Sequence, residues 1–377
     1  MNAKPLVVAL LLVGSVTAPV AAAASTTDTQ QGQAGAFVSF EAKSNTVTDY
    51  TVDGTTVVKN VSVQSESEAS GGGSIDLGGS TDFSGAGLSV ASSMEASGSA
   101  MVNSESGATI ESHDNQRGVL VIRPGGGSQV AAINVSSDAE AESESDSRVV
   151  IEKDDGTQAV VLATGDAEVT VTDEGDVEGR TGEDGTLVYR QYDGERSDDD
   201  ESQEEFIANG TATAELYYQQ ASESGDSGGE RAVNVVNYGQ DTTVEVTERS
   251  ASTLNATVER SQSEGKVVLV SVSEAAMENA ESTSVYVDGE AAAEASSYSE
   301  VAAAADGGDS SAYLVRSSSS AEATTDVVVG INGFSEREMS MQSDSSGGAT
   351  GSGGQPGFGV GVAVVALAGA TLLAARR

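Results

Sequence analysis

Residues 148–164 read RVVIEKDDGTQAVVLAT, in which two apolar runs rich in Val flank the turn Asp154-Asp155-Gly156-Thr157. Val and Ile favour strands because a side chain branched at Cβ fits a pleated surface. A short turn that contains Gly between two such runs is typical of a β-hairpin. This stretch therefore predicts two antiparallel strands, and it is the clearest β signal in the chain.

The same pattern occurs 29 residues earlier, where residues 119–135 read VLVIRPGGGSQVAAINV. Val121-Ile122, Gly127-Ser128-Gln129 and Ile133 match Val150-Ile151, Gly156-Thr157-Gln158 and Leu162. After a one-residue slip, Asp138-Ala139-Glu140 matches Asp166-Ala167-Glu168, and Leu187–Arg190 resembles a degenerate third unit. Two clear units are too few for a solenoid. They predict internal hairpin repeats within one extended β-sheet or sandwich.

Turn signals extend this β prediction along the chain. Asp53-Gly54 separates Tyr50–Val52 from Val57–Val63, which is a strong short-range hairpin signal. Between residues 206 and 339, Val-rich strand candidates recur every roughly 8–15 residues, a spacing that suits a sandwich. Ser197–Ile207 and Glu274–Ala280 predict short helices. The fold class is therefore mainly β, with antiparallel sandwich or extended β-sheet regions.

The charge of the chain is extreme. Its 377 residues hold 59 Asp and Glu against 18 Lys and Arg, a formal net charge of −41. Self-repulsion of this size destabilises a compact state, whereas molar salt screens it. We therefore expect a chain that folds in high salt, as in a halophilic archaeon. Nucleic acid is excluded as a partner because phosphate binding needs clustered basic residues, and the absence of Cys excludes disulfides and thiolate sites.

The N-terminus has the three parts of a secretory signal. Lys4 precedes an uncharged apolar stretch from Pro5 to Val20, and small residues follow at Ala21–Ala24. A positive segment, an apolar segment and a small-residue site are what signal peptidase requires. We expect cleavage after Ala23 or Ala24, with Ala22 completing the small-residue pattern, and the alternative is an uncleaved N-terminal anchor.

The C-terminus has a matching organisation. Residues 340–355 are a polar Ser/Gly-rich stretch, which predicts a flexible spacer. Pro356-Gly357-Phe358 follows, and the residues from Pro356 to Ala375 are uncharged and long enough to span a bilayer as a helix. Arg376 and Arg377 end the chain and favour a cytoplasmic C-terminus. Both ends therefore predict that the bulk of the chain lies outside the membrane.

This C-terminal arrangement resembles the PGF-CTERM sorting signal of archaeal surface proteins. The resemblance implies that an archaeosortase cuts near the PGF motif and exchanges the transmembrane helix for a lipid. The alternative is an ordinary tail helix that stays attached. Removal of both ends takes away Lys4, Arg376 and Arg377 but no acid, which changes the formal charge from −41 to −44.

The sequence predicts six regions along the chain. They are a signal peptide (1–24), a polar leader with a hairpin and a Ser/Gly-rich part (25–107), a β-repeat region (108–195), a second β-domain (196–339), a spacer (340–355) and the sorting signal with its transmembrane helix (356–377). Residues 64–107 are compatible with either a low-complexity linker or a stack of short strands.

Candidate chemistry is sparse. His113, in Glu111–Gln116, predicts a solvated turn histidine, because no nucleophile context accompanies it. The acid clusters Asp154-Asp155, Asp173–Asp176 and Asp198–Glu201 match no EF-hand spacing, so hydrated surface acids are expected, with weak Ca²⁺ or Mg²⁺ binding as the alternative. We expect no catalytic residue, no metal site and no cofactor. Four N-x-[ST] sequons, at Asn60, Asn134, Asn209 and Asn255, are candidate glycosylation sites.

These features predict a class of protein rather than an activity. We expect an exported, membrane-tethered surface protein that is structural or adhesive and associates with the envelope or S-layer. The expected partners are the membrane, signal peptidase, an archaeosortase and the S-layer. The alternatives are an extracellular module that binds a solute or a divalent ion and, third, a secreted hydrolase. A concave polar pocket would favour the binding module, and a close carboxylate pair with shifted pKa values would favour the hydrolase.

Overall fold

The computed structural model describes residues 31–343 except 35, 44–45, 71–97, 105, 221–230 and 318–323. Within these ranges the chain is mainly β, as predicted, and its strands form four sheets. Helical segments in the described chain are α1 (Glu66–Ser70), α2 (Asp198–Ala208), α3 (Tyr298–Ala305) and the 3₁₀ turn η1 (Ala280–Ser282). None of these helices is long and apolar enough to cross a membrane. The predicted signal peptide and the predicted helix after Pro356 lie outside the described residues.

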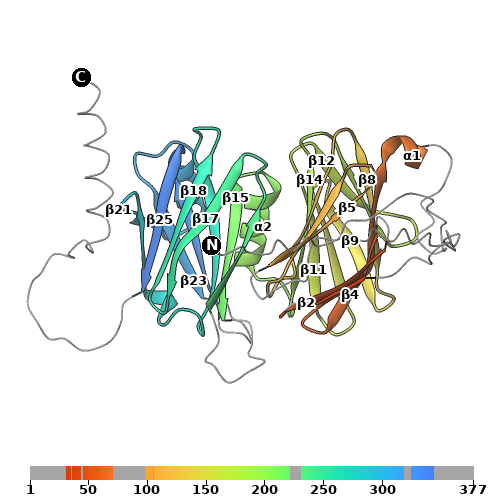
Figure 1. Cartoon of the computed structure of the whole chain (residues 1–377), viewed down its shortest axis with the longest axis horizontal. Coiled ribbons are helices and arrows are strands. Elements are labelled where there is room, and N and C mark those ends of the chain that lie inside the picture. The colour runs from red at the N-terminus through yellow and green to blue at the C-terminus, as the bar shows by residue number, and fades with distance from the viewer. Residues whose placement is uncertain are drawn as a thin grey trace, which may run out of the picture. The chain divides into compact units, whose positions relative to one another are not determined.

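The first sandwich consists of two antiparallel seven-stranded sheets (Figure 1). Sheet A runs in the order β1 (Gln31–Ala34), β2 (Val38–Lys43), β3 (Thr46–Val52), β4 (Thr55–Ser65), β8 (Gln129–Val135), β13 (Val177–Thr181), β12 (Ala167–Val171). Sheet B runs β5 (Ser99–Asn103), β6 (Thr109–His113), β7 (Leu120–Arg123), β14 (Thr186–Tyr192), β11 (Gln158–Thr164), β10 (Arg148–Lys153), β9 (Ala139–Ser145). Their facing side chains, such as Val61, Ile133, Ile151 and Tyr189, form one core.

The second sandwich pairs a six-stranded with a five-stranded sheet. Sheet C runs β16 (Arg231–Asn237), β15 (Ala212–Gln220), β19 (Lys266–Ser273), β24 (Thr324–Ile331), β23 (Ala312–Ser317), β22 (Ala293–Glu294), with parallel pairing at β15–β19 and β22–β23. Sheet D runs β17 (Thr242–Ser250), β18 (Thr253–Arg260), β25 (Glu336–Ser343), β20 (Thr283–Val287), β21 (Glu290–Ala291). Residues 340–343, predicted to begin the spacer, belong to β25 because Met339 and Met341 fill this core.

Strands from two predicted regions share the first sandwich. β4, from residues 25–107, pairs with β8, from residues 108–195, and Val61 lies opposite Ile133. β5, also from residues 25–107, likewise pairs with β6 of residues 108–195. Because the Val side chains of β4 need an apolar partner layer, the hairpin at Asp53-Gly54 folds only as part of the larger sandwich.

Local turn predictions hold. The predicted hairpin is β3–β4, and Asp53 and Gly54 have φ values of 46° and 78°. Positive φ at both turn residues is the conformation that Asp-Gly favours in two-residue hairpins. Helix α2 also forms where predicted, and Ser197 caps it by accepting from the backbone N–H of Asp200. The helix predicted over Glu274–Ala280 is wrong: this segment is a turn followed by η1, and Met277 inserts into the second core.

The repeated hairpin forms only once. β10 and β11 pair as predicted, with Val150 opposite Val160. β7 and β8, the matching strands of the first unit, lie in different sheets. β7 is bonded on both edges to β6 and β14, and β8 to β4 and β13, so neither strand has a free edge for the other. The two repeat units therefore resemble each other because both contain strand-forming and turn-forming residues, and not because their strands pair in the same way.

Central strands of sheets B and C, such as β14 and β15, are buried on both faces. In β14, Leu187 and Tyr189 face the first core, while Val188, Arg190 and Tyr192 point the other way. This alternation is the period of two that every strand imposes on its side chains. A third core lies on the outward faces of the two sheets and includes Val121, Leu162 and Val188 of sheet B, Phe206 and Ile207 of α2, and Tyr217, Val236 and Leu269 of sheet C.

Candidate functional site

The junction between sheets B and C contains a buried ion pair. Arg190 of β14 and Glu215 of β15 are 0% and 1% exposed, and the guanidinium Nη2 donates to Glu215 Oε1 over 2.9 Å. The Tyr238 hydroxyl donates to the other carboxylate oxygen. Burial, the largest single effect, lowers the pKa of Arg190, but the Glu215 carboxylate together with Tyr192, Tyr217 and Tyr238 holds that pKa well above its usual value. The Arg190 guanidinium is therefore charged, and the Glu215 carboxylate is its ionic partner.

Helix α2 supplies a second ionic cluster at the junction. Arg117 donates to Asp200 of α2 over 2.7 Å, and its guanidinium lies 4.4 Å from the centre of the Tyr192 ring. The Tyr192 hydroxyl donates to Glu204, which is fully buried and also accepts from Arg196 over 2.7 Å. Because α2 joins the two sandwiches in sequence, these contacts fix the connection to sheet B.

The turn around His113 also faces the junction, and the prediction of a solvated histidine is wrong. His113 is 2% exposed, and burial lowers its pKa to about 4 even though the Glu111 carboxylate 3.6 Å away acts in the opposite direction. Asp114 accepts hydrogen bonds from the backbone N–H groups of Ala36, Phe37 and Val38. The polar composition of Glu111–Gln116 gives no sign that the turn is buried, because the residues that cover it are distant in sequence.

Amide side chains link this turn to the second sandwich. Asn115 Nδ2 donates to Asn234 Oδ1 over 2.9 Å, and Asn234 Nδ2 donates to the carbonyl of Gly98. Gln219 Nε2 donates to the carbonyl of Asp114 over 3.1 Å. The Asn115–Asn234 and Gln219–Asp114 bonds are buried and the Asn234–Gly98 bond is partly buried, so these bonds help to hold the two sandwiches in one relative position.

The acid clusters lie partly at the surface, as expected: Asp154, Asp155, Asp173, Glu174, Asp198 and Glu201 are exposed, whereas other members have structural partners. Asp199 and Asp200 lie in the first turn of α2 and pair with Arg316 and Arg117. Asp176 accepts from Asn134 Nδ2 and the backbone N–H of Val135, and Asp155 accepts from the N–H of Thr157. In the described ranges, no group of three or more His, Asp or Glu side chains is arranged to hold a metal ion.

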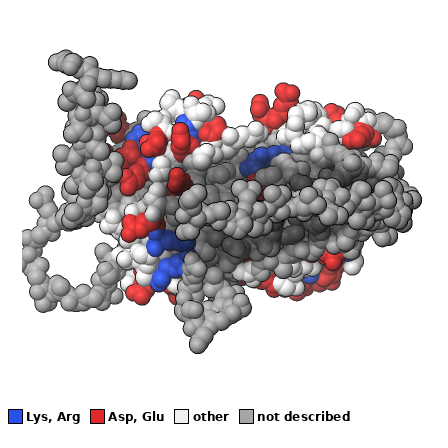
Figure 2. All heavy atoms as spheres, in the orientation of Figure 1, with Lys and Arg blue, Asp and Glu red and all other residues white. Residues whose placement is uncertain are grey.

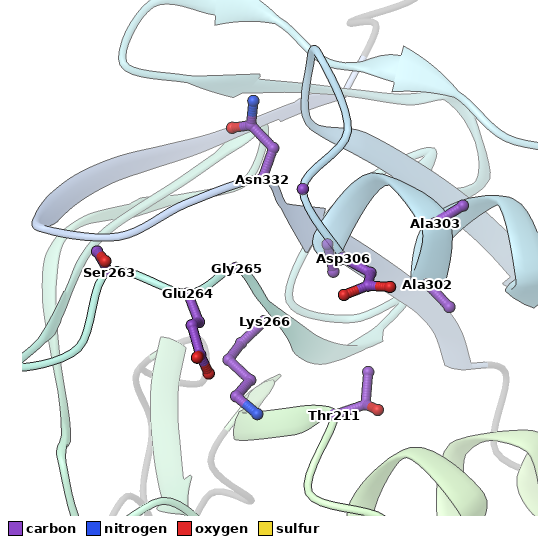
Figure 3. Close-up of a pocket in the computed structure, with 11 residues that line it drawn as sticks. Thr211, Ser263, Glu264, Gly265, Lys266, Ala302, Ala303, Asp306 and Asn332 are labelled. Atoms are coloured by element: carbon purple, nitrogen blue, oxygen red, sulfur yellow. The ribbon is translucent and has the colours of Figure 1, made fainter.

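An open pocket lies at the end of sheet C, beside α3 (Figure 3). Its volume is about 760 Å³, and its polar lining residues are Thr211, Ser263, Glu264, Lys266, Asp306 and Asn332. Glu264, which lies just before β19, and Lys266, the first residue of β19, both point toward the loop of Thr211. Lys266 Nζ donates to the carbonyl of Gly210 over 2.8 Å. Among the described residues, no aromatic ring lines the pocket, so they offer no stacking surface to a sugar or nucleobase there.

The four sequons occupy different environments. Asn60 of β4 and Asn134 of β8 are neighbours across sheet A, and Asn134 is 8% exposed. Asn255 lies in β18 between β17 and β25, and its Nδ2 donates to Glu248 over 3.0 Å. Asn209 is the exposed residue of the four and lies in the turn that follows α2.

The predicted processing residues lie outside the described ranges: Ala22, Ala23, Ala24, Pro356, Gly357, Phe358, Arg376 and Arg377. Comparison with protein families addresses the C-terminal group, because residues 355–377 match the PGF-CTERM motif. This motif is the archaeosortase sorting signal, and it marks proteins that are anchored to the membrane and face outside the cell. No curated protein matches the chain.

Proposed function

We propose that this surface-anchored chain is a structural or interaction component of the cell envelope, associated with the S-layer and without catalytic activity. The observation that supports this role most directly is the junction, which joins two sandwiches through a third core and the buried Arg190–Glu215 ion pair, with further ion pairs at the connecting helix α2. Two domains joined by a small polar interface would move relative to one another. Here desolvated charges and amides oppose such motion, as suits a part that must hold its shape.

The surface chemistry supports an extracellular structural role in concentrated salt. On the face shown in Figure 2, Asp and Glu side chains are spread over the described surface, and Lys and Arg are few. Many of the described arginines lie in ion pairs, including Arg117, Arg190 and Arg196 at the junction. Many of the positively charged side chains are therefore paired with acidic ones, and the charge on the outer surface comes mainly from Asp and Glu.

A genetic comparison tests this role against its alternatives. We would compare cells that lack the protein, cells that make the full chain, and cells whose chain lacks residues 356–377. We expect the first and third to lose cell shape or to lyse on dilution, because a chain released into the medium cannot support the envelope. Normal envelopes combined with a defect in solute uptake would favour the binding module instead, and loss of an extracellular hydrolytic activity would favour the hydrolase.

Peptide mass mapping of the protein from purified membranes tests its processing. We expect a chain that begins near Ser25 and lacks the peptide Gly359–Arg377, with a lipid on the new C-terminus. A chain that begins near Ser25 but retains Arg376 and Arg377 would be a plain tail-anchored protein. It would keep the location but contradict cleavage by an archaeosortase.

A further inference from the structure

We propose that Asn209 carries an N-linked oligosaccharide and that the pocket beside Lys266 accommodates its first sugars. Asn209 is exposed and begins the sequon Asn209-Gly210-Thr211 in the turn after α2. Its Oδ1 accepts from the backbone N–H of Thr211 over 2.9 Å. Within the described residues the structure gives its Nδ2 no hydrogen bond, so the reacting atom stays available.

The other sequons are held inside sheets. Asn134 is nearly buried, and its Nδ2 donates to Asp176 Oδ2 over 2.8 Å. Asn255 Nδ2 is likewise engaged with Glu248. Asn60 lies between β3 and β8, opposite Asn134. A glycan at Asn134 or Asn255 would have to break the hydrogen bond that holds the reacting Nδ2, whereas Asn209 in an exposed surface turn needs no such change.

The chemistry requires a donor that the protein does not itself carry. The donor class is an oligosaccharide linked through its anomeric carbon to a lipid phosphate. The Asn209 amide nitrogen attacks that carbon, a C–N bond forms, and the C–O bond to the phosphate breaks. The amide loses one proton, and the lipid phosphate leaves with the bonding electrons.

The turn that carries Asn209 leads directly into the lining of the pocket. Thr211 is a lining residue, and the carbonyl of Gly210 accepts from Lys266 Nζ. Glu264, Asp306 and Asn332 add hydrogen-bonding groups that suit a hydroxyl-rich ligand. A free sugar would bind weakly without an aromatic platform. A sugar tethered two residues away has a high effective concentration, so weak polar contacts suffice to hold it.

The test uses the full chain purified from its own membranes. Glycopeptide mass spectrometry should find an oligosaccharide on Asn209 and none on Asn134 or Asn255. Asn209→Gln and Thr211→Ala should both remove that mass, and Thr211→Ser should keep it because the sequon survives. Circular dichroism of each variant shows whether it is folded.

Acylation of lysine amines by a water-soluble active ester tests the pocket. Lys266 should react several-fold more slowly in the wild type and T211S than in N209Q and T211A. Lys153, which pairs with Asp138, is the matched control and should react equally in all four proteins. An unmodified Asn209 overturns the proposal, and so does a glycosylated chain in which Lys266 reacts as fast as in N209Q.

Discussion

Arg190 and Glu215 belong to different sandwiches, yet their side chains meet at 2.9 Å with neither more than 1% exposed. Strand alternation explains the encounter. Leu187 and Tyr189 face the first core, and Leu216 and Tyr218 face the second, so Arg190 and Glu215 both point into the space between sheets B and C. The pair is thus a consequence of two strands that are each buried on both faces.

Removal of one partner should therefore be severe. Arg190→Met leaves the Glu215 carboxylate buried with only neutral donors, and we expect the free energy of unfolding to fall by about 3–5 kcal/mol. Urea unfolding in molar KCl measures the change. Arg180→Met is the control, because the Arg180–Glu178 pair is largely exposed and should cost less than about 1 kcal/mol.

The double variant separates the pair from its surroundings. Arg190→Met combined with Glu215→Leu removes both charges, so much of the stability lost in R190M should return. If R190M costs no more than the Arg180 control, or if the double variant is less stable than the sum of the single variants, the pair does not hold the junction.

Short-range chemistry accounts for what the sequence could predict. Asp53-Gly54 specifies its own turn, and Ser197 with Asp200 specifies the start of α2, because all the interacting groups lie within three residues. The strand pairing of the two repeat units could not be predicted from short-range chemistry. β7 and β8 have strand chemistry like that of β10 and β11, but their partners are chosen by β4, β6, β13 and β14, which are distant in sequence.

The same limit applies to the candidate sites. His113 sits in a polar hexapeptide, and only the fold shows that β2 and sheet C bury this turn. The four sequons are equivalent as motifs, and their exposure distinguishes them only in the structure. The C-terminal signal was readable because it acts as a linear segment, and its recognition depends on no distant partner.

His113 should make the stability of the protein depend on pH. Its pKa is about 4 in the folded chain against an ordinary 6.5, so the unfolded chain binds more protons between these values. The free energy of unfolding should therefore fall as pH drops from 6.5 toward 4, by about 3 kcal/mol from this group. Glu111, which raises the pKa, and Arg123, which lowers it, are the charged neighbours.

His113→Gln isolates this contribution, because His113 is the single histidine of the chain. Denaturant unfolding of both proteins at several pH values in molar KCl gives two stability curves. The wild-type curve should fall by about 3 kcal/mol more than the variant curve as pH drops from 6.5 toward 4, since only the wild type gains a proton on unfolding at this position. Parallel curves over that range would show that His113 is not buried as a neutral ring.

Gly125 should not tolerate a side chain. A Cβ built at this position overlaps the carbonyl of Gly107, so the two loops that meet there would have to separate. We expect Gly125→Ala to lower the free energy of unfolding by about 1–3 kcal/mol. Gly194→Ala is the matched control, because a Cβ there meets no atom within 4 Å and the change should stay within about 0.5 kcal/mol. Equal effects at both positions would contradict the close packing of the two loops.

We expect folding to require concentrated salt, and the acidic residues of strand β9 illustrate the reason. Glu140 and Glu142 project from the edge strand β9, and Glu140 lies directly opposite Glu152 of β10. Like charges in this position repel each other. The Debye length is about 10 Å at 0.1 M salt and about 3 Å at 1 M, so only concentrated salt screens neighbours at this spacing. Circular dichroism of residues 25–355 across a KCl series should show β-structure at molar salt and its loss in dilute buffer.

Two variants of β9 test whether unpaired acids cause the dependence on salt. Glu140→Gln with Glu142→Gln removes unpaired acid and should move the folding midpoint to lower KCl. Glu144→Gln also removes one negative charge from β9, but Glu144 accepts from Arg196 over 2.7 Å, so its loss should leave the midpoint unchanged or raise it. Net charge alone would lower the midpoint in both cases. Opposite shifts would show that paired and unpaired acids act differently, whereas an equal β signal at low and molar salt would remove the argument for a high-salt fold.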